Sequence, residues 1–216
     1  MKTALVRSLT LLFAFYFLLC GCQTTYYTIW EKLGKEKRHL LKDNVEKAKK
    51  EQTLASEQFE NVLDRIKHMY GLHGGALETF YEKLSDEYQD CERRAESVRD
   101  RIENVKEIAS DMFREWAEEI KVISNVNLKS KSKKALTKTR IRYNRLERAM
   151  SRAEASMHPV LINLNDYVLY LKHNLNAQAI SALGKEVGDI ELEVSSLIAD
   201  MDKSIKEADA FLKAMD

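Results

Sequence analysis

Apolar residues recur along this sequence at alternating steps of three and four positions, with polar residues between them. The longest such seam covers residues 77–116, and similar seams cover residues 41–69, 136–171 and 183–215. An apolar seam that repeats about every 3.5 residues over several heptads is typical of a helix that supercoils against its neighbours. No segment of useful length alternates as a strand would. The pattern therefore predicts an all-α protein.

Turn-forming residues separate the seams. A glycine-rich stretch at residues 71–75 suits the first turn, and residues 124–127 suit the second. Asn174 and Asn176 mark the third turn, and Gly184 is a competing break. We therefore expect helices over residues 30–71, 76–124, 130–174 and 177–214.

Short turns between long helices favour an up-down-up-down arrangement. The predicted fold is therefore an elongated antiparallel four-helix bundle or coiled coil. Ser130 or Ser132 is expected to cap the third helix, because a serine hydroxyl accepts a hydrogen bond from a free N–H of the first turn. Pro159 should bend or split the same helix, because proline lacks a backbone N–H.

The start of the chain resembles a bacterial lipoprotein signal peptide. Lys2 and Arg7 accompany an almost wholly apolar run at residues 8–19, which is shorter than the ~20 residues of a membrane-spanning helix. The run ends in Leu19-Cys20-Gly21-Cys22, which is similar to the lipoprotein box, with a small residue before the cysteine that is lipidated. We expect diacylglycerol and palmitate on Cys22; an ordinary secreted protein cleaved nearby is the alternative.

This resemblance also implies a location. Gln23 follows the lipidated cysteine, where an aspartate would favour retention in the inner membrane, so we expect the periplasmic face of the outer membrane. Aromatic residues at 26, 27 and 30 lie at headgroup level, cap the lower end of the bundle, or do both. The expected organisation is a signal peptide at residues 1–21, a lipidated anchor and short linker at 22–29, and one helical bundle domain at 30–216.

Composition and charge narrow the class of protein. The chain has 35 Lys and Arg against 34 Asp and Glu, and removal of the signal peptide takes away two cations, so the mature chain is nearly neutral. Near neutrality and export both argue against a nucleic-acid-binding protein. A charged fraction of 32% with one Pro and seven Gly is typical of long solvated helices.

Cysteine usage excludes an internal disulfide framework in the mature chain. Only Cys22 and Cys91 remain after processing, and lipid occupies Cys22. Cys91 lies at a seam position, so we expect a buried small apolar residue. An intermolecular disulfide between two bundles is the alternative. The sequence does not decide whether the protein forms a homo-oligomer.

A basic run covers residues 129–152, with ten Lys or Arg and a single acid, Glu147. Two interpretations are open. The run neutralises the acidic ends of the second and fourth helices, which an antiparallel bundle places nearby. Otherwise it contacts lipid phosphates or lipopolysaccharide, with Lys131, Lys133, Lys134 and Arg140 as contact residues.

A polar patch interrupts the apolar pattern at the end of the third helix. Lys172 and His173 suit the negative pole of a helix C-terminus, and Asn174 tolerates a left-handed backbone. A helix end explains much of this patch. The alternative is a surface of Lys172, His173 and Asn174 that contacts a partner protein.

The sequence contains no recognisable catalytic or metal-binding pattern. It lacks a phosphate-binding loop, a nucleophile-elbow serine and a His-Glu-x-x-His pair. The one Glu-x-x-His spacing, Glu36 to His39, lies among cations that would repel a metal. His68 and His73 flank the glycine-rich turn without a third ligand nearby. We therefore expect no enzyme activity, no cofactor and no metal.

Several segments resemble a bacterial family catalogued as domain of unknown function 2959. They are Trp30-Glu31-Lys32-Leu33-Gly34, Glu57-Gln58-Phe59 and Met157-His158-Pro159-Val160-Leu161, together with residues 81–88 and 169–176. The resemblance covers nearly the whole mature chain. It implies an envelope lipoprotein with no established activity, and it supplies no functional residues to carry over. His158 departs from the family pattern, in which an acid precedes the proline.

The sequence thus favours a non-enzymatic helical lipoprotein that serves as a scaffold or adaptor for another envelope protein. A helical protein of the cell envelope that binds anionic lipid or glycan is the alternative. No nucleic-acid partner is expected.

Overall fold

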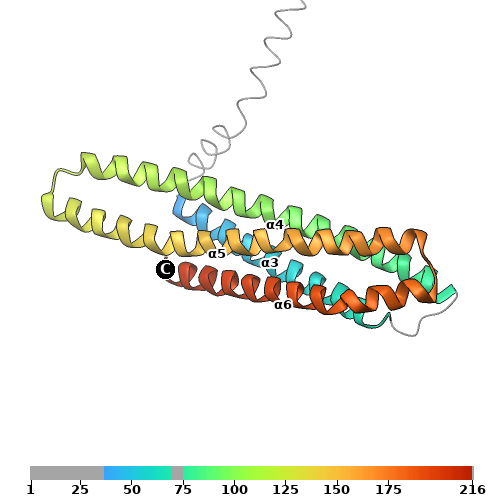
Figure 1. Cartoon of the computed structure of the whole chain (residues 1–216). Coiled ribbons are helices and arrows are strands. Elements are labelled where there is room, and N and C mark those ends of the chain that lie inside the picture. Colours follow the sequence, from blue (N-terminus) through green and yellow to red (C-terminus); the bar gives the residue numbers. More distant parts are fainter. Residues whose placement is uncertain (1–36, 70–74, 216) are drawn as a thin grey trace, which may run out of the picture. The chain divides into compact units, whose positions relative to one another are not determined.

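The computed structural model describes residues 37–69 and 75–215 and contains four helices in this range. They are α3 (Lys37–Lys67), α4 (Gly75–Val122), α5 (Val126–His173) and α6 (Ala177–Lys213), shown in Figure 1. The chain divides into two compact units, Met1–Leu40 and Leu41–Asp216. The predictions for the signal peptide, for Cys22, for the aromatic residues at 26–30 and for the first turn fall outside the described residues.

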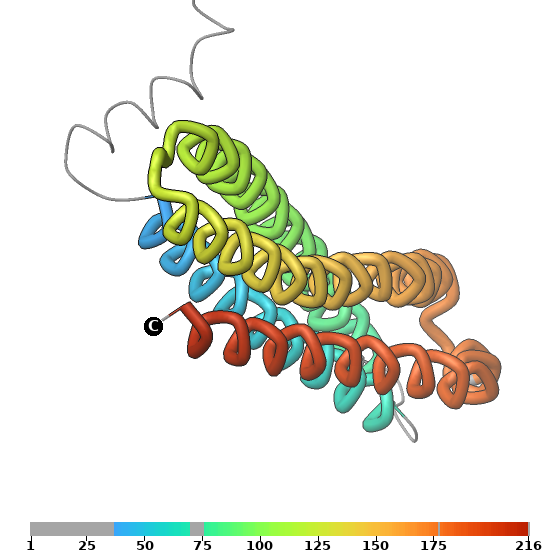
Figure 2. Tube along the Cα trace, turned by 90° about the vertical axis from the view of Figure 1, so that its left-hand side faces the viewer, coloured from blue at the N-terminus to red at the C-terminus, as the bar shows by residue number. Residues whose placement is uncertain are grey.

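Within the unit that begins at Leu41, the helices pack side by side as an antiparallel four-helix bundle (Figures 1 and 2). Helix α5 packs against both α4 and α6. Helix α3 is joined to α6 by the ion pair of Lys49 Nζ with Asp209 Oδ1 at 2.8 Å, and to α4 by that of Arg94 with Glu51 at 3.5 Å. The predicted all-α bundle is confirmed.

The predicted apolar seams form the core of this bundle. Burying such side chains is the main favourable contribution to folding, at about 25 cal/mol per Å² of apolar surface removed from water. The seam residues that are almost fully buried include Leu41, Val45, Phe59, Ile66, Leu84, Cys91, Val98, Ile102, Leu146, Met157, Leu164, Leu171, Ile190, Val194 and Leu197. The spacing of apolar residues therefore determines which face of each helix points inward.

The seams of α3 and α6 each skip one expected apolar position, and the structure brings these two positions together. In α3 the heptad step after Ala48 falls on Gln52, and in α6 the step after Met201 falls on Ser204. Both side chains are buried, and the Ser204 hydroxyl donates a hydrogen bond of 2.8 Å to Gln52 Oε1. A buried polar pair of this kind favours one axial register, because any slip would leave both groups unpaired.

Helix α5 begins earlier than predicted. Asn125 is its N-cap, and the Asn125 side-chain oxygen accepts 3.0 Å hydrogen bonds from the backbone N–H groups of Asn127 and Leu128. The expectation that Ser130 or Ser132 caps the helix is wrong. An asparagine already positioned at the turn satisfies the free N–H groups before the chain reaches either serine.

The third turn is placed correctly by its two asparagines. Asn174 is the C-cap of α5, although its φ of −135° is not the left-handed conformation that its residue type suggested. Asn176 is the N-cap of α6, where its side chain accepts a 3.0 Å hydrogen bond from Ala179 N–H. Gly184 does not interrupt α6. Glycine in a helix interior costs only about 1 kcal/mol relative to alanine, which tertiary packing readily offsets.

Pro159 does not split α5, which runs through it as one helix. Proline removes one backbone N–H, so the carbonyl of Ala155 loses its helical donor. Both Pro159 and Ala155 are exposed, and water can hydrogen-bond to this carbonyl. The solvent-facing position explains why the helix tolerates the proline.

Candidate functional site

The α4–α5 hairpin extends beyond the part of the bundle in which four helices pack together (Figure 1). The last aromatic contacts of the core join Phe113 of α4 to Tyr143 of α5, with ring centroids 5.4 Å apart, and Tyr143 to Phe211 near the end of α6, at 6.1 Å. Beyond them, none of residues 121–142 is buried. We call residues 121–142 the hairpin tip.

Polar contacts hold the two helices together at this tip. Trp116 Nε1 donates a 3.0 Å hydrogen bond to the Ser132 hydroxyl, and Lys129 Nζ donates one of 2.8 Å to the Lys121 carbonyl. The Lys129 ammonium thus satisfies a backbone carbonyl of the last turn of α4, which has no helical donor. The tip is therefore an ordered pair of helix ends joined by a capped turn.

Three apolar side chains at the tip contribute nothing to the core. Val122 is 81% exposed, Val126 is 78% exposed and Leu128 is 56% exposed. Single exposed apolar residues are common, but a group at one projecting end is typical of a surface that contacts something else.

Seven cations of the basic run, from Lys129 to Arg142, lie on the α5 side of the hairpin tip, and the other three follow further along α5. Among the described residues, none of its ten cations forms an ion pair within 4.0 Å. Acids that were expected to neutralise the run are paired elsewhere: Glu118 with Lys121 of its own helix, and Asp209 with Lys49 of α3. Glu118 and Asp209 therefore form their ion pairs with cations outside the run.

The four predicted contact residues of the run differ in their surroundings. Lys131, Lys133 and Lys134 are exposed on the tip. The Arg140 guanidinium instead lies over the Phe113 ring, 5.2 Å from its centroid. This cation–π contact ties α5 to α4, so Arg140 also has a structural role.

The predicted patch of Lys172, His173 and Asn174 lies at the other end of α5. Lys172 and His173 are exposed in its last turn. Asn174 closes the helix: its N–H donates to the Leu171 carbonyl at 3.1 Å, and its side-chain amide donates to the Tyr170 carbonyl at 2.9 Å. These contacts support the helix-end interpretation, and the structure does not bring this patch together with the basic run.

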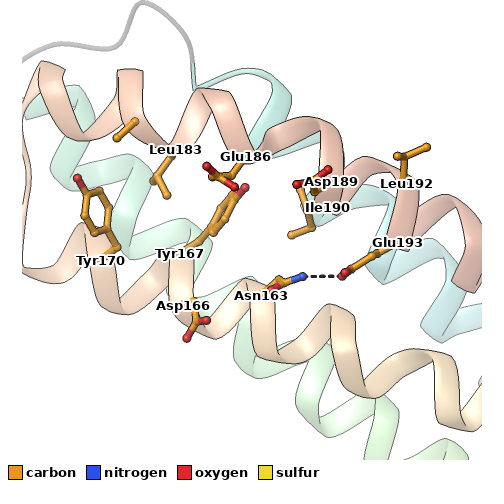
Figure 3. A pocket seen from close by; sticks show the side chains of 11 residues that line it. Asn163, Asp166, Tyr167, Tyr170, Leu183, Glu186, Asp189, Ile190, Leu192 and Glu193 are labelled. Atoms are coloured by element: carbon orange, nitrogen blue, oxygen red, sulfur yellow. Dashed lines mark hydrogen bonds between the residues drawn. The ribbon is translucent and has the colours of Figure 1, made fainter.

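An open groove of about 740 Å³ lies between α5 and α6 near this same end of α5 (Figure 3). Its apolar surface includes Tyr170, which is 39% exposed, and Leu192, which is 70% exposed. We call this the α5–α6 groove. Its remaining lining residues are Asn163, Asp166, Tyr167, Ala182, Leu183, Glu186, Asp189, Ile190 and Glu193.

The α5–α6 groove has an acidic rim. Asn163 donates a 2.6 Å hydrogen bond to the Glu193 carboxylate across the groove (Figure 3). Asp166, Glu186 and Asp189 form no ion pair within 4.0 Å among the described residues. The surface therefore combines negative charge with exposed apolar side chains.

Sequence reasoning missed this groove and the apolar tip. Leu192 lies between the seam positions Ile190 and Val194, and Val126 and Leu128 lie outside the third seam. The signal available in the sequence was an apolar residue at a position where the heptad pattern expects a polar one. Such residues are too common singly for the pattern alone to identify a surface.

Cys91 is buried in the core, as its seam position predicts. Its thiol lies 3.9 Å from the Gln58 carbonyl. Burial, with smaller contributions from the negative charges of Glu87 and Asp90, raises the pKa of the Cys91 thiol from 9.0 to about 12. The native thiol is therefore a poor nucleophile at neutral pH, because the thiolate is the reactive form.

This raised pKa predicts a pH-dependent contribution to stability. The folded state favours the neutral thiol, so the contribution is complete below pH 9.0 and is lost as pH rises toward about 12. We expect the stability difference between the native chain and Cys91→Ala to shrink between pH 8 and 11, as measured by urea unfolding. A difference that stays constant over this interval would contradict the predicted titration.

No group of three or more His, Cys, Asp or Glu side chains in the described part of the chain is arranged to hold a metal ion. None of the described helices is long and apolar enough to span a membrane.

Comparison with known proteins finds one family. The model of a family described as a protein of unknown function (DUF2959) matches residues 26–215. No curated protein and no solved structure matches the chain.

Proposed function

We propose that the chain, which belongs to the DUF2959 family, is a non-enzymatic lipoprotein of the bacterial envelope that serves as a helical scaffold or adaptor. A lipid on Cys22 tethers it to the periplasmic face of the outer membrane. The lipoprotein box in the sequence supports the tether, and the lack of a catalytic pattern in the sequence supports a non-enzymatic role.

The observation that carries the adaptor role is the α5–α6 groove. The first residues of α3 from Leu41 onward lie at the same end of the bundle as the end of α6 (Figure 1), so the tethered segment joins the bundle at the end opposite this groove. At ~1.5 Å per residue, the stretch of α5 from Tyr143, which contacts Phe211 at that end, to Asp166 in the groove is roughly 35 Å long. The groove is thus presented toward the end of this unit opposite to the one at which the chain enters it at Leu41.

The chemistry of the groove indicates the kind of partner that it binds. Asp166, Glu186 and Asp189 are negatively charged and lie beside exposed Tyr170 and Leu192. A segment of another envelope protein with cationic and apolar side chains complements both features. Charge complementarity of this kind mainly determines specificity and association rate, while the buried apolar anchors contribute most of the affinity.

Crosslinking in living cells tests this proposal. A photoreactive amino acid at Leu192 should capture a reproducible envelope protein, and Glu186→Lys combined with Asp189→Lys should abolish that capture. A photoreactive amino acid at exposed Lys203, on the same helix but outside the groove, is the matched control. Equal capture from positions 192 and 203, or capture that survives the double reversal of charge, would refute the groove as the adaptor site.

The cations of the hairpin tip favour a second function at the opposite end of the bundle, the binding of anionic lipid or glycan. Like charges three and four positions apart on a helix destabilise it by a few tenths of a kcal/mol per pair. Among the described residues these cations form no ion pair within 4.0 Å, and an external anion is their counter-charge in this second function.

A further inference from the structure

We infer that the hairpin tip is a docking site for an anionic phospholipid bilayer, which its apolar residues enter while its lysines contact lipid phosphates. The inference rests on the proposed lipid-binding function and is independent of the partner at the α5–α6 groove. Two features meet at the tip: exposed Val122, Val126 and Leu128 at its extremity, and cations directly behind them.

The order of these features along α5 matches the layers of a membrane surface. Val126 and Leu128 come first, and Lys129, Lys131 and Lys133 follow within the next turns. Moving inward from water, a bilayer presents phosphates and then acyl chains. An apolar extremity with a cationic collar complements this order, and each part contributes to interfacial binding.

A small groove on the hairpin also combines apolar side chains with lysines. Between α4 and α5, Ala117, Ile120 and Leu136 line a space of about 330 Å³. Lys121, Lys129 and Lys133 complete its lining. The aliphatic stems of lysines extend over apolar surface while their ammonium groups stay in water or near phosphate.

The connectivity of the chain favours a bilayer over other anions. Helix α3 from Leu41 onward begins, and α6 ends, at the end of the bundle from which the tip projects (Figures 1 and 2). The tethered segment therefore joins the bundle on the same side as the tip. A tip docked on the lipid would fix the orientation of the bundle, with the α5–α6 groove directed away from the membrane.

Depth measurements on the full chain in vesicles test the inference. An environment-sensitive fluorescent amino acid is placed at Val126, or at exposed Ser196 of α6 as the control. Vesicles contain phosphatidylethanolamine and phosphatidylglycerol, or phosphatidylcholine alone, with a fraction of lipid that carries a quencher on its acyl chains. Only protein that floats with the vesicles is measured.

We expect strong quenching at Val126 in the phosphatidylglycerol vesicles, weak quenching in phosphatidylcholine, and none at Ser196. Replacing Lys131, Lys133 and Lys134 by Gln should remove most of the quenching. So should 1 M salt, which shortens the screening length from ~10 Å at 0.1 M to ~3 Å.

Three results would overturn the inference. The first is quenching at Val126 no greater than at Ser196. The second is quenching that is equal on phosphatidylcholine. The third is quenching that needs added lipopolysaccharide. If Val126 stays unquenched while the three Lys→Gln changes still weaken flotation with phosphatidylglycerol, lipid binding holds but docking by the apolar tip does not.

Discussion

Phe59→Ala is expected to lower the free energy of unfolding by about 3–5 kcal/mol. Phe59 lies in the α3 seam and is fully buried. The substitution removes an aromatic ring from a close-packed core and leaves a cavity that neighbouring helices fill only in part. Urea unfolding of the full chain in mild detergent, followed by circular dichroism, measures the change.

Leu192→Ala is the matched control for this substitution. Leu192 is 70% exposed on the outer side of α6. Removing it should change the free energy of unfolding by no more than about 0.5 kcal/mol, as is usual for surface positions. If both substitutions had the same effect, the assignment of inner and outer faces would be wrong.

Ser204→Ala is expected to cost about 1–3 kcal/mol although it removes a single oxygen atom. The Ser204 hydroxyl donates a hydrogen bond to Gln52 Oε1 inside the core, and Gln52 is itself almost fully buried. Without the hydroxyl, Gln52 keeps the cost of desolvation and loses the compensating contact. The same urea titration measures this loss.

A second substitution distinguishes a lost hydrogen bond from a lost packing contact. Gln52 Nε2 already lacks a hydrogen-bond partner, so this side chain is only half satisfied in the native core. Adding Gln52→Leu to Ser204→Ala replaces both polar groups by apolar ones and should restore much of the stability. A double variant as unstable as the sum of the two single variants would contradict the account.

Residue spacing in the sequence predicts the inward face of each helix. The seam residues are buried because a 3.5-residue repeat keeps one stripe of each helix facing its neighbours. The pairing of Gln52 with Ser204 was not predictable from either segment alone. It depends on the axial register between α3 and α6, because the two residues are 152 positions apart in the sequence.

The residues that cap the helices were predictable from the sequence where one residue type suited the turn. They were not predictable where several suitable residues lay close together. Asn174 and Asn176 end one helix and begin the next, as expected. At the second turn, Asn125, Ser130 and Ser132 were all acceptable caps. The structure selects Asn125 and leaves Ser132 to accept the Trp116 hydrogen bond.

The interaction surfaces depend on where neighbouring helices end, which periodicity does not show. The basic run was expected beside the acidic end of α6. Residues 143–152 of the run do lie there, because Tyr143 contacts Phe211 of α6. Residues 121–142 project beyond that contact without a buried residue. The seven cations of residues 129–142 therefore lie beyond the part of the bundle in which four helices pack together.

The lipid on Cys22 is the central claim, because both proposed surfaces depend on attachment at one end of the bundle. Its most direct test is metabolic labelling of cells with a palmitate analogue, followed by membrane fractionation. The account predicts label on the native chain, recovery in the outer-membrane fraction, and loss of the label in Cys22→Ser. An unlabelled native chain, or equal label on Cys22→Ser, would contradict it.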